Sequence, residues 1–190
     1  MQYGDLQVDR AGLARLNWVG ELQTSAAATL AKFQDYSYHF GVAGLALYGM
    51  LNDPSLPAAL TPSTKAAGGT KWVNNGVIVA TANEIISDIT ALVMDIVTRS
   101  NSTIQKTDAF KLVMPPQSDV ALLATNQFGI NVMDLLTKNF PNLTVVTDPR
   151  HATASGNLVQ LWAPNFNGTK AGTCAFNEKL RDHQISHIFQ

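Results

Sequence analysis

The longest apolar pattern in the chain runs through its first forty residues and is typical of one long amphipathic helix. Apolar or small residues recur at alternating steps of three and four, which places them on one helix face. The positions of this stripe are Leu16, Val19, Gln23, Ala26, Leu30, Phe33, Ser37 and Phe40, of which Gln23 and Ser37 are polar. Asp9 is suited to cap the start of the helix, and Gly41 and Gly44 follow its end.

A helix over residues 9–40 would be more than twice the average length of about 11–12 residues. The rest of a chain of 190 residues is too small to cover such a helix along its whole length. The pattern therefore predicts that part of this helix packs against other subunits.

The charged fraction of the chain favours the same conclusion. Asp, Glu, Lys and Arg make up 14% of the residues, against roughly 25% in a typical soluble domain. A surface built from uncharged polar side chains can be buried against neighbours without desolvating many charges. A monomer with an uncharged polar surface is the alternative interpretation.

Net charge and hydropathy exclude two classes of partner. The net charge of −1 leaves no basic excess to neutralise phosphates, so we expect no sequence-specific nucleic-acid binding. The longest weakly polar run, residues 40–51, is too short to span a membrane, and the first residues do not form a signal peptide. The single cysteine, Cys174, excludes an internal disulfide framework and fits synthesis inside a cell.

After the long helix, the sequence predicts a loop and then short helices and strands. Residues 58–76 are expected to form the loop, with a turn at Gly68-Gly69 and Trp72 as an anchor. Thr81 and Glu84 form a capping box for a helix over residues 82–99. The later elements are expected at 110–114 (strand), 117–124 (helix), 131–140 (helix), 143–147 (strand), 157–163 (strand), 164–174 (turn or hairpin), 176–181 (helix) and 185–189 (strand). This order predicts an α+β fold.

Two groups of residues in the sequence are candidates for metal or anion binding. His183 and His187 are spaced to share one helix face, but a zinc-peptidase motif requires Glu where this chain has Gln184. Arg150 and His151 follow a predicted strand and could hold an anion, although a turn capped by Asp148 explains the same residues.

We therefore expect no catalytic residue, no cofactor-binding residue and no metal ligand. A small metal-dependent hydrolase that uses His183, His187 or His151 is the remote alternative. The methionines at 50, 94, 114 and 133 are expected in the core.

Five phrases, in order along the chain, carry a family resemblance. They are Gly41-Val-Ala-Gly44-Leu with Gly49-Met-Leu-Asn52-Asp-Pro54-Ser-Leu-Pro57; Trp72 with Thr81-Ala-Asn-Glu84-Ile-Ile-Ser-Asp88-Ile89; Leu112-Val-Met-Pro115 with Leu122-Leu-Ala-Thr-Asn126 and Asn139-Phe-Pro-Asn142-Leu; Pro149 with Gly156-Asn-Leu-Val-Gln-Leu161; and Ala175-Phe-Asn-Glu178-Lys-Leu-Arg181-Asp-His183. This combination resembles the major capsid proteins of tailed bacteriophages and prophages. That family shares its shell fold with encapsulins and with the herpesvirus capsid floor.

The resemblance implies a long spine helix in a peripheral lobe and an axial lobe of helices around a small mixed sheet. Residues 1–50 would form the spine, residues 51–180 mainly the axial lobe, and residues 181–190 the return to the peripheral lobe. The family's N-terminal arm, its extended loop before the spine, and its peripheral strands beyond the equivalent of His187 have no counterpart in this sequence. The chain is therefore expected to be the spine-plus-axial core of such a subunit.

The implied function is that of a non-enzymatic shell subunit, which self-assembles through hexamer and pentamer contacts. The implied partners are copies of itself, together with scaffold, portal and other virion proteins. The implied location is the virion, after synthesis in the bacterial host cytoplasm. An encapsulin-like nanocompartment is the alternative. The expected interface regions are the polar side of the spine helix, residues 52–57, and the loops at 58–76 and 164–174.

Overall fold

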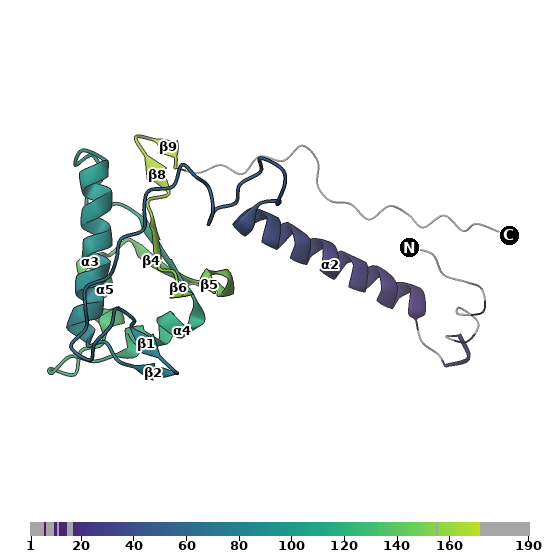
Figure 1. Ribbon diagram of the computed structural model, residues 1–190, viewed down its shortest axis with the longest axis horizontal. Helices are drawn as coiled ribbons and strands as arrows, with labels where there is room; N and C mark the ends of the chain where they lie inside the picture. Colours follow the sequence, from purple (N-terminus) through teal and green to yellow (C-terminus); the bar gives the residue numbers. More distant parts are fainter. Residues whose placement is uncertain (1–5, 7–9, 11, 15–16, 155, 172–190) are drawn as a thin grey trace. The chain divides into compact units, whose positions relative to one another are not determined.

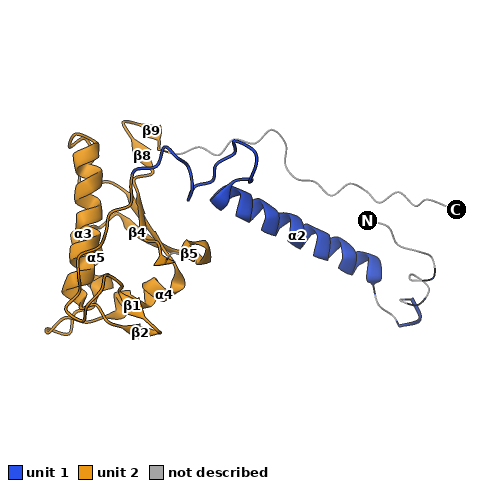
Figure 2. Cartoon of the chain, in the orientation of Figure 1, with its two compact units in different colours: residues 1–57, 175–190 blue, residues 58–174 orange. Residues whose placement is uncertain are grey.

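The computed structural model describes residues 6, 10, 12–14, 17–154 and 156–171 (Figure 1). The chain divides into two compact units, residues 1–57 with 175–190 and residues 58–174 (Figure 2). The predicted helix at 176–181 and the predicted strand at 185–189 lie outside the described residues.

The first unit contains helix α2, Trp18–Phe40, with 23 residues. The predicted start at Asp9 is wrong for this helix, because the chain leaves helical geometry at Asn17. The Asn17 side chain accepts a hydrogen bond from the Gly20 N–H at 3.2 Å, so this residue is the N-cap. The end at Phe40 is as predicted.

The second unit is built around helix α3, Ala82–Arg99, and a three-stranded sheet. The strands are β3 (Phe110–Met114), β4 (Leu143–Thr147) and β7 (Gln160–Trp162), in the order β4-β3-β7. Strand β3 pairs in parallel with β4 and antiparallel with β7. The predicted strands at 110–114 (β3) and 143–147 (β4) and the predicted capping box of α3 are confirmed.

Short elements connect the sheet strands. They are α4 (Pro116–Asp119), the 3-10 helix η1 (Val120–Leu123), α5 (Val132–Asn139) and the 3-10 helix η2 (Pro149–His151). The predicted single helix at 117–124 is therefore two shorter turns of different type. Asn131 caps α5 as predicted, by accepting from the Asp134 N–H at 2.6 Å.

Three β-hairpins, each made of two strands of two residues, complete the described part of the second unit. They are β1 (Val73–Asn74) with β2 (Val77–Ile78), β5 (Ala152–Thr153) with β6 (Gly156–Asn157), and β8 (Asn165–Phe166) with β9 (Thr169–Lys170). The β1–β2 hairpin was not predicted from the sequence, because its strands are too short to show an alternating pattern. The third confirms the hairpin expected within 164–174, and the strand expected over 157–163 is split between β6 and β7.

The core of the second unit lies among α3, β3, η1 and α5. Its most buried apolar side chains are Ile85, Ile89, Phe110, Leu112, Met114, Ala121, Val132 and Leu136. Met114 was expected there, but Met94 and Met133 are 59% and 39% exposed, so their core assignment is wrong. Both lie on helices, at positions turned away from the buried face. The fold is α+β, as predicted, and no helix in the described ranges is long and apolar enough to cross a membrane.

Candidate assembly interface

The C-terminal end of α2 is closed by the segment that follows it. Four carbonyls at a helix end have no partner within the helix. Here the Ser37 carbonyl accepts from the Gly41 N–H, and those of Tyr38 and His39 accept from the Met50 and Leu51 N–H groups at 2.9 Å. The Phe40 carbonyl accepts from the Asn52 side-chain amide at 2.6 Å. We call residues 49–52 the clasp of α2.

Two glycines of the resemblance make this arrangement possible. A Cβ atom at Gly49 would collide with the main chain of His39, and one at Gly41 would collide with the carbonyl of Leu47. Gly41 also has φ of 68°, in the left-handed region. The side-chain oxygen of Asn52 accepts from the Gly49 N–H at 2.7 Å, so this asparagine joins the clasp to the helix end.

The next segment is ordered by a local turn. The Asp53 carboxylate accepts from the Ser55 hydroxyl at 2.6 Å and from the Ser55 N–H at 2.8 Å. These two hydrogen bonds lower the pKa of Asp53, and the bond from the Ser55 hydroxyl has the larger effect. Residues 52–57, expected to take part in an interface, therefore begin with side chains that already serve the chain's own structure.

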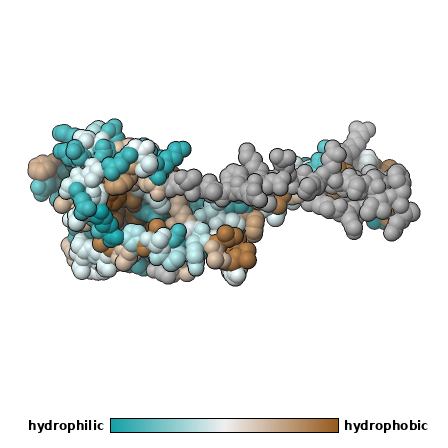
Figure 3. Space-filling model, turned by 90° about the horizontal axis from the view of Figure 1, so that it is seen from above, coloured by the Kyte–Doolittle hydropathy of each residue, from teal (hydrophilic) through white to brown (hydrophobic). Residues whose placement is uncertain are grey.

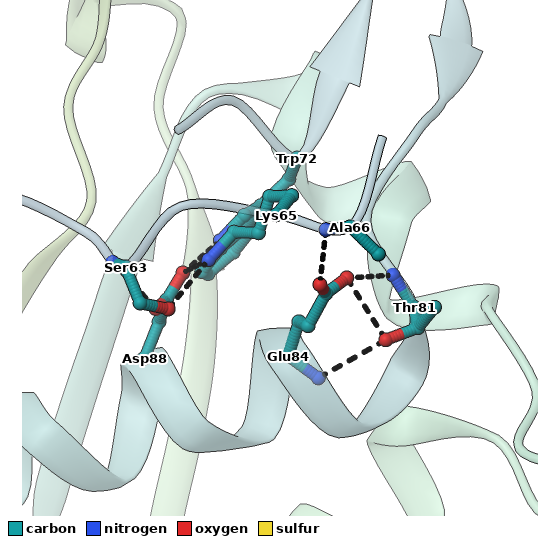
Figure 4. Close-up of polar contacts among 7 residues, drawn as sticks. All are labelled: Ser63, Lys65, Ala66, Trp72, Thr81, Glu84 and Asp88. Carbon is teal, nitrogen blue, oxygen red and sulfur yellow. Dashed lines mark hydrogen bonds and ion pairs between the residues drawn. The ribbon is translucent and has the colours of Figure 1, made fainter. Parts of the chain in front are cut away.

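A buried polar cluster holds the loop at 58–76 against α3 (Figure 4). The Lys65 ammonium lies 2.5 Å from one carboxylate oxygen of Asp88, and the Trp72 indole N–H donates to the same oxygen at 2.7 Å. The Ser63 hydroxyl donates to the other oxygen at 3.0 Å. The Lys65 side chain is fully buried. Trp72 is confirmed as an anchor, while the burial of Lys65 could not be foreseen from a loop pattern.

Glu84 makes a second connection between the loop and the start of α3. Its carboxylate accepts from the N–H and hydroxyl of Thr81 at 2.7 and 2.9 Å, and from the Ala66 N–H at 2.7 Å (Figure 4). These hydrogen bonds, led by that of the Thr81 N–H, lower the pKa of Glu84. One capping carboxylate thus fixes both the helix start and the loop.

The described histidines occupy structural positions. His39 lies in α2, with its Nδ1 2.8 Å from the carbonyl of Asp35, one turn earlier. His151 is buried in η2, with Nδ1 3.3 Å from the Asp148 carboxylate and Nε2 3.2 Å from the Gln160 side-chain oxygen.

Asp148 also accepts from the Arg150 N–H at 2.9 Å, which confirms the Asp-capped turn. His183, His187 and Cys174 lie outside the described residues. Within the described ranges, no three His, Cys, Asp or Glu side chains are grouped closely enough to hold a metal ion.

Large apolar side chains on α2 are left uncovered in the described part of the first unit. No residue of α2 is buried. Its exposed aromatic residues are Trp18, Phe33, Tyr36, Tyr38 and Phe40. A helix of this length with uncovered aromatic side chains is the geometry expected of a surface that other subunits cover.

A second exposed apolar group lies where η1 leads into α5. Its members are Val120, Leu123, Phe128, Ile130 and Met133, and we call it the tip patch. Phe128 is 76% exposed. The Asn126 side-chain oxygen accepts from the Phe128 and Ile130 N–H groups at 2.9 and 3.1 Å. An aromatic side chain on a fixed turn is suited to anchor a contact.

Sequence reasoning did not find the tip patch, because a single Phe in a polar loop carries no periodic signal. Figure 3 shows one face of the molecule, on which hydrophobic residues of the second unit form separate patches among polar ones.

Comparison with known structures gives the class of the fold. The chain is similar to a chain of a structure titled "The capsid of Myoviridae Phage XM1", with a TM-score of 0.61 and 18% sequence identity. The likeness covers 81% of this chain and 50% of that chain. The chain thus spans half the length of its phage XM1 counterpart and has the fold of a phage capsid protein.

The sequence itself gives the family. The family model described as Pa193 gp26 major capsid protein matches residues 1–188, and the chain belongs to that family. No curated protein matches the chain.

Proposed function

We propose that this chain is a structural subunit of a bacteriophage capsid shell, which assembles with copies of itself through hexamer and pentamer contacts. One observation carries the proposal beyond family membership. Helix α2 and the tip patch present large apolar side chains that the described residues leave uncovered. Burying such groups between subunits would provide the main driving force for association.

The mechanism of such a subunit is geometric. One fold makes many similar contacts and closes a shell, so each contact can be weak while the assembly is stable. The peripheral lobe at residues 1–50, the axial lobe at 51–180 and the return at 181–190 remain part of the proposal. The low charge of the chain supports it, because few charges lose their hydration when surfaces meet.

The proposal includes the following partners and location. The subunit acts without catalysis, cofactor or metal, in the virion, after synthesis in the cytoplasm of a bacterial host. Scaffold, portal and other virion proteins are its further partners. Membership of a major capsid protein family supports these statements.

The role of the tip patch in this proposal is tested by a substitution in the full-length protein. Phe128→Asp places a charge on the exposed aromatic position, and we expect it to lower the assembled fraction at least about tenfold in sedimentation velocity. Gln127→Asp is the matched control, because it adds the same charge to the neighbouring exposed residue without removing an apolar group. Circular dichroism should show both variants folded. Equal assembly of Phe128→Asp and wild type would exclude the tip patch as a contact.

A further inference from the structure

Strand β4 forms one edge of the three-stranded sheet, and half of its main-chain groups face away from the sheet. The Phe110 N–H donates to the Asn142 carbonyl at 3.1 Å, and the Asp148 N–H donates to the Met114 carbonyl at 2.9 Å. In a parallel ladder the inward groups belong to alternate residues. Thr144 and Val146 therefore bond to β3, and the N–H groups of Val145 and Thr147 point outward. In the described ranges, β3 is the only strand that pairs with β4.

This edge lacks the usual protection against pairing. Natural edge strands are short, charged, bulged or interrupted by proline. Strand β4 is Leu-Thr-Val-Val-Thr, with no charge, no proline and four β-branched residues in five. Thr147, whose main-chain groups face outward, is an exposed residue. By contrast, the opposite edge of the sheet, β7, has three residues, and the hairpin strands have two each.

The flanking residues delimit the open edge. Proline precedes the strand at position 141 and follows it at position 149, and Asp148 accepts hydrogen bonds in the η2 turn. Pairing is thus confined to five residues, with the outward N–H groups of Val145 and Thr147 and the outward carbonyls of Leu143, Val145 and Thr147. This is a docking edge for one short extended segment.

We infer that this edge accepts an extended segment of a second copy of the chain, as an added β-strand. The inference rests on the proposed function, which brings copies together. The absence of charge on β4 favours an uncharged partner segment, because an edge with no charged side chain offers no counter-charge to an acidic or basic partner. A chain in which charged residues make up only 14% supplies uncharged segments of its own.

Amide hydrogen exchange of the full-length protein tests the inference, by comparing unassembled and assembled material. The Val145 and Thr147 amides should exchange at least about tenfold more slowly after assembly. The Thr144 and Val146 amides, already bonded to β3, are the internal controls and should be protected in both states. Assembled particles in which Val145 and Thr147 exchange as freely as before would overturn the inference and leave the shell function intact.

Other outcomes are equally decisive. Protection of both outward amides in the unassembled subunit would mean that the same copy covers the edge, which overturns the inference. Protection that appears only with another virion protein would assign the edge to that partner and would also overturn it. Failure of the wild-type protein to assemble at all would count against the proposed function itself.

A proline variant supplies the second test. Thr147→Pro removes one outward N–H from an exposed residue and leaves the bonds to β3 in place, because proline is tolerated on an edge strand. Thr147→Ser is the matched control, since it keeps the N–H. We expect Thr147→Pro to remain folded by circular dichroism and to lose at least about tenfold in assembled fraction, while Thr147→Ser keeps it. Equal assembly of the two variants would contradict the inference.

Discussion

Lys65 shows how a single charged residue can decide the conformation of a loop. A buried ammonium is stable only with a paired charge and satisfied hydrogen bonds. Asp88 provides the charge, and Trp72 and Ser63 complete the coordination of its carboxylate. A chain with few charges thus places one opposite pair inside the second unit, where it helps Trp72 to hold the loop at 58–76.

Removal of the Lys65 charge should destabilise the second unit. In Lys65→Met the Asp88 carboxylate stays buried without its counter-charge, which costs about 3 kcal/mol of unfolding free energy. Urea denaturation monitored by Trp fluorescence measures this cost. Lys71→Met, at an exposed lysine of the same loop, should change the value by less than about 0.5 kcal/mol. A similar loss in both variants would show that the buried pair has no special role.

The Glu84 carboxylate makes the stability of the second unit depend on pH. Its folded pKa lies below the ordinary value of 4.5, so its stabilisation is fully present above that value and is lost as pH falls through the folded pKa. Wild type should therefore be more stable than Glu84→Gln at pH 7. Thermal melts in a pH series should show this difference shrinking below pH 4.5. A difference that stays constant into the acid range would rule out this carboxylate as the titrating group.

At the scale of elements, the clasp turns the end of α2 into a defined structure. Asn52→Asp keeps the oxygen that accepts from Gly49 but loses the N–H group that donates to the Phe40 carbonyl. It also adds negative charge at the negative end of the helix dipole. We expect a local cost of about 1–2 kcal/mol, seen as faster exchange of the Met50 and Leu51 amides.

Asn74→Asp is the control for this experiment, since Asn74 is exposed in β1. It should leave the Met50 and Leu51 amides unchanged. Unchanged exchange in Asn52→Asp as well would show that Asn52 does not hold the clasp.

Local signals predicted the elements that depend on local chemistry. The capping box at Thr81 and Glu84 gave α3 with its correct bounds, and the buried strand β3 was found from its apolar run. The start of α2 was wrong, because both Asp9 and Asn17 have capping side chains and only the observed backbone geometry distinguishes them. The buried Lys65 pairs with a residue 23 positions away, and a contact at that separation leaves no mark in a local pattern.

The sequence indicated only part of the surfaces proposed here for subunit contacts. Phe33 and Phe40 of α2 belong to the apolar stripe that the sequence shows, and residues 52–57 were expected in an interface. The tip patch and the open edge of β4 could not be read from the sequence. Exposure of Phe128 depends on its turn, and the edge position of β4 depends on strand order.

At the scale of the whole molecule, the low charge makes a prediction about salt. Contacts driven by apolar burial and main-chain pairing respond little to screening, unlike contacts between charged surfaces. Raising NaCl from about 0.05 to about 0.5 M should change the assembled fraction by less than about threefold in sedimentation velocity. Dissociation at the higher concentration would mean that a few ion pairs dominate the contacts.

Negative-stain electron microscopy of the full-length protein is the decisive test of whether this chain builds a shell. We expect rings, sheets or closed shells made of hexamers and pentamers when the protein is concentrated. A protein that remains monomeric at high concentration, with no ring, sheet or shell in the images, would contradict it.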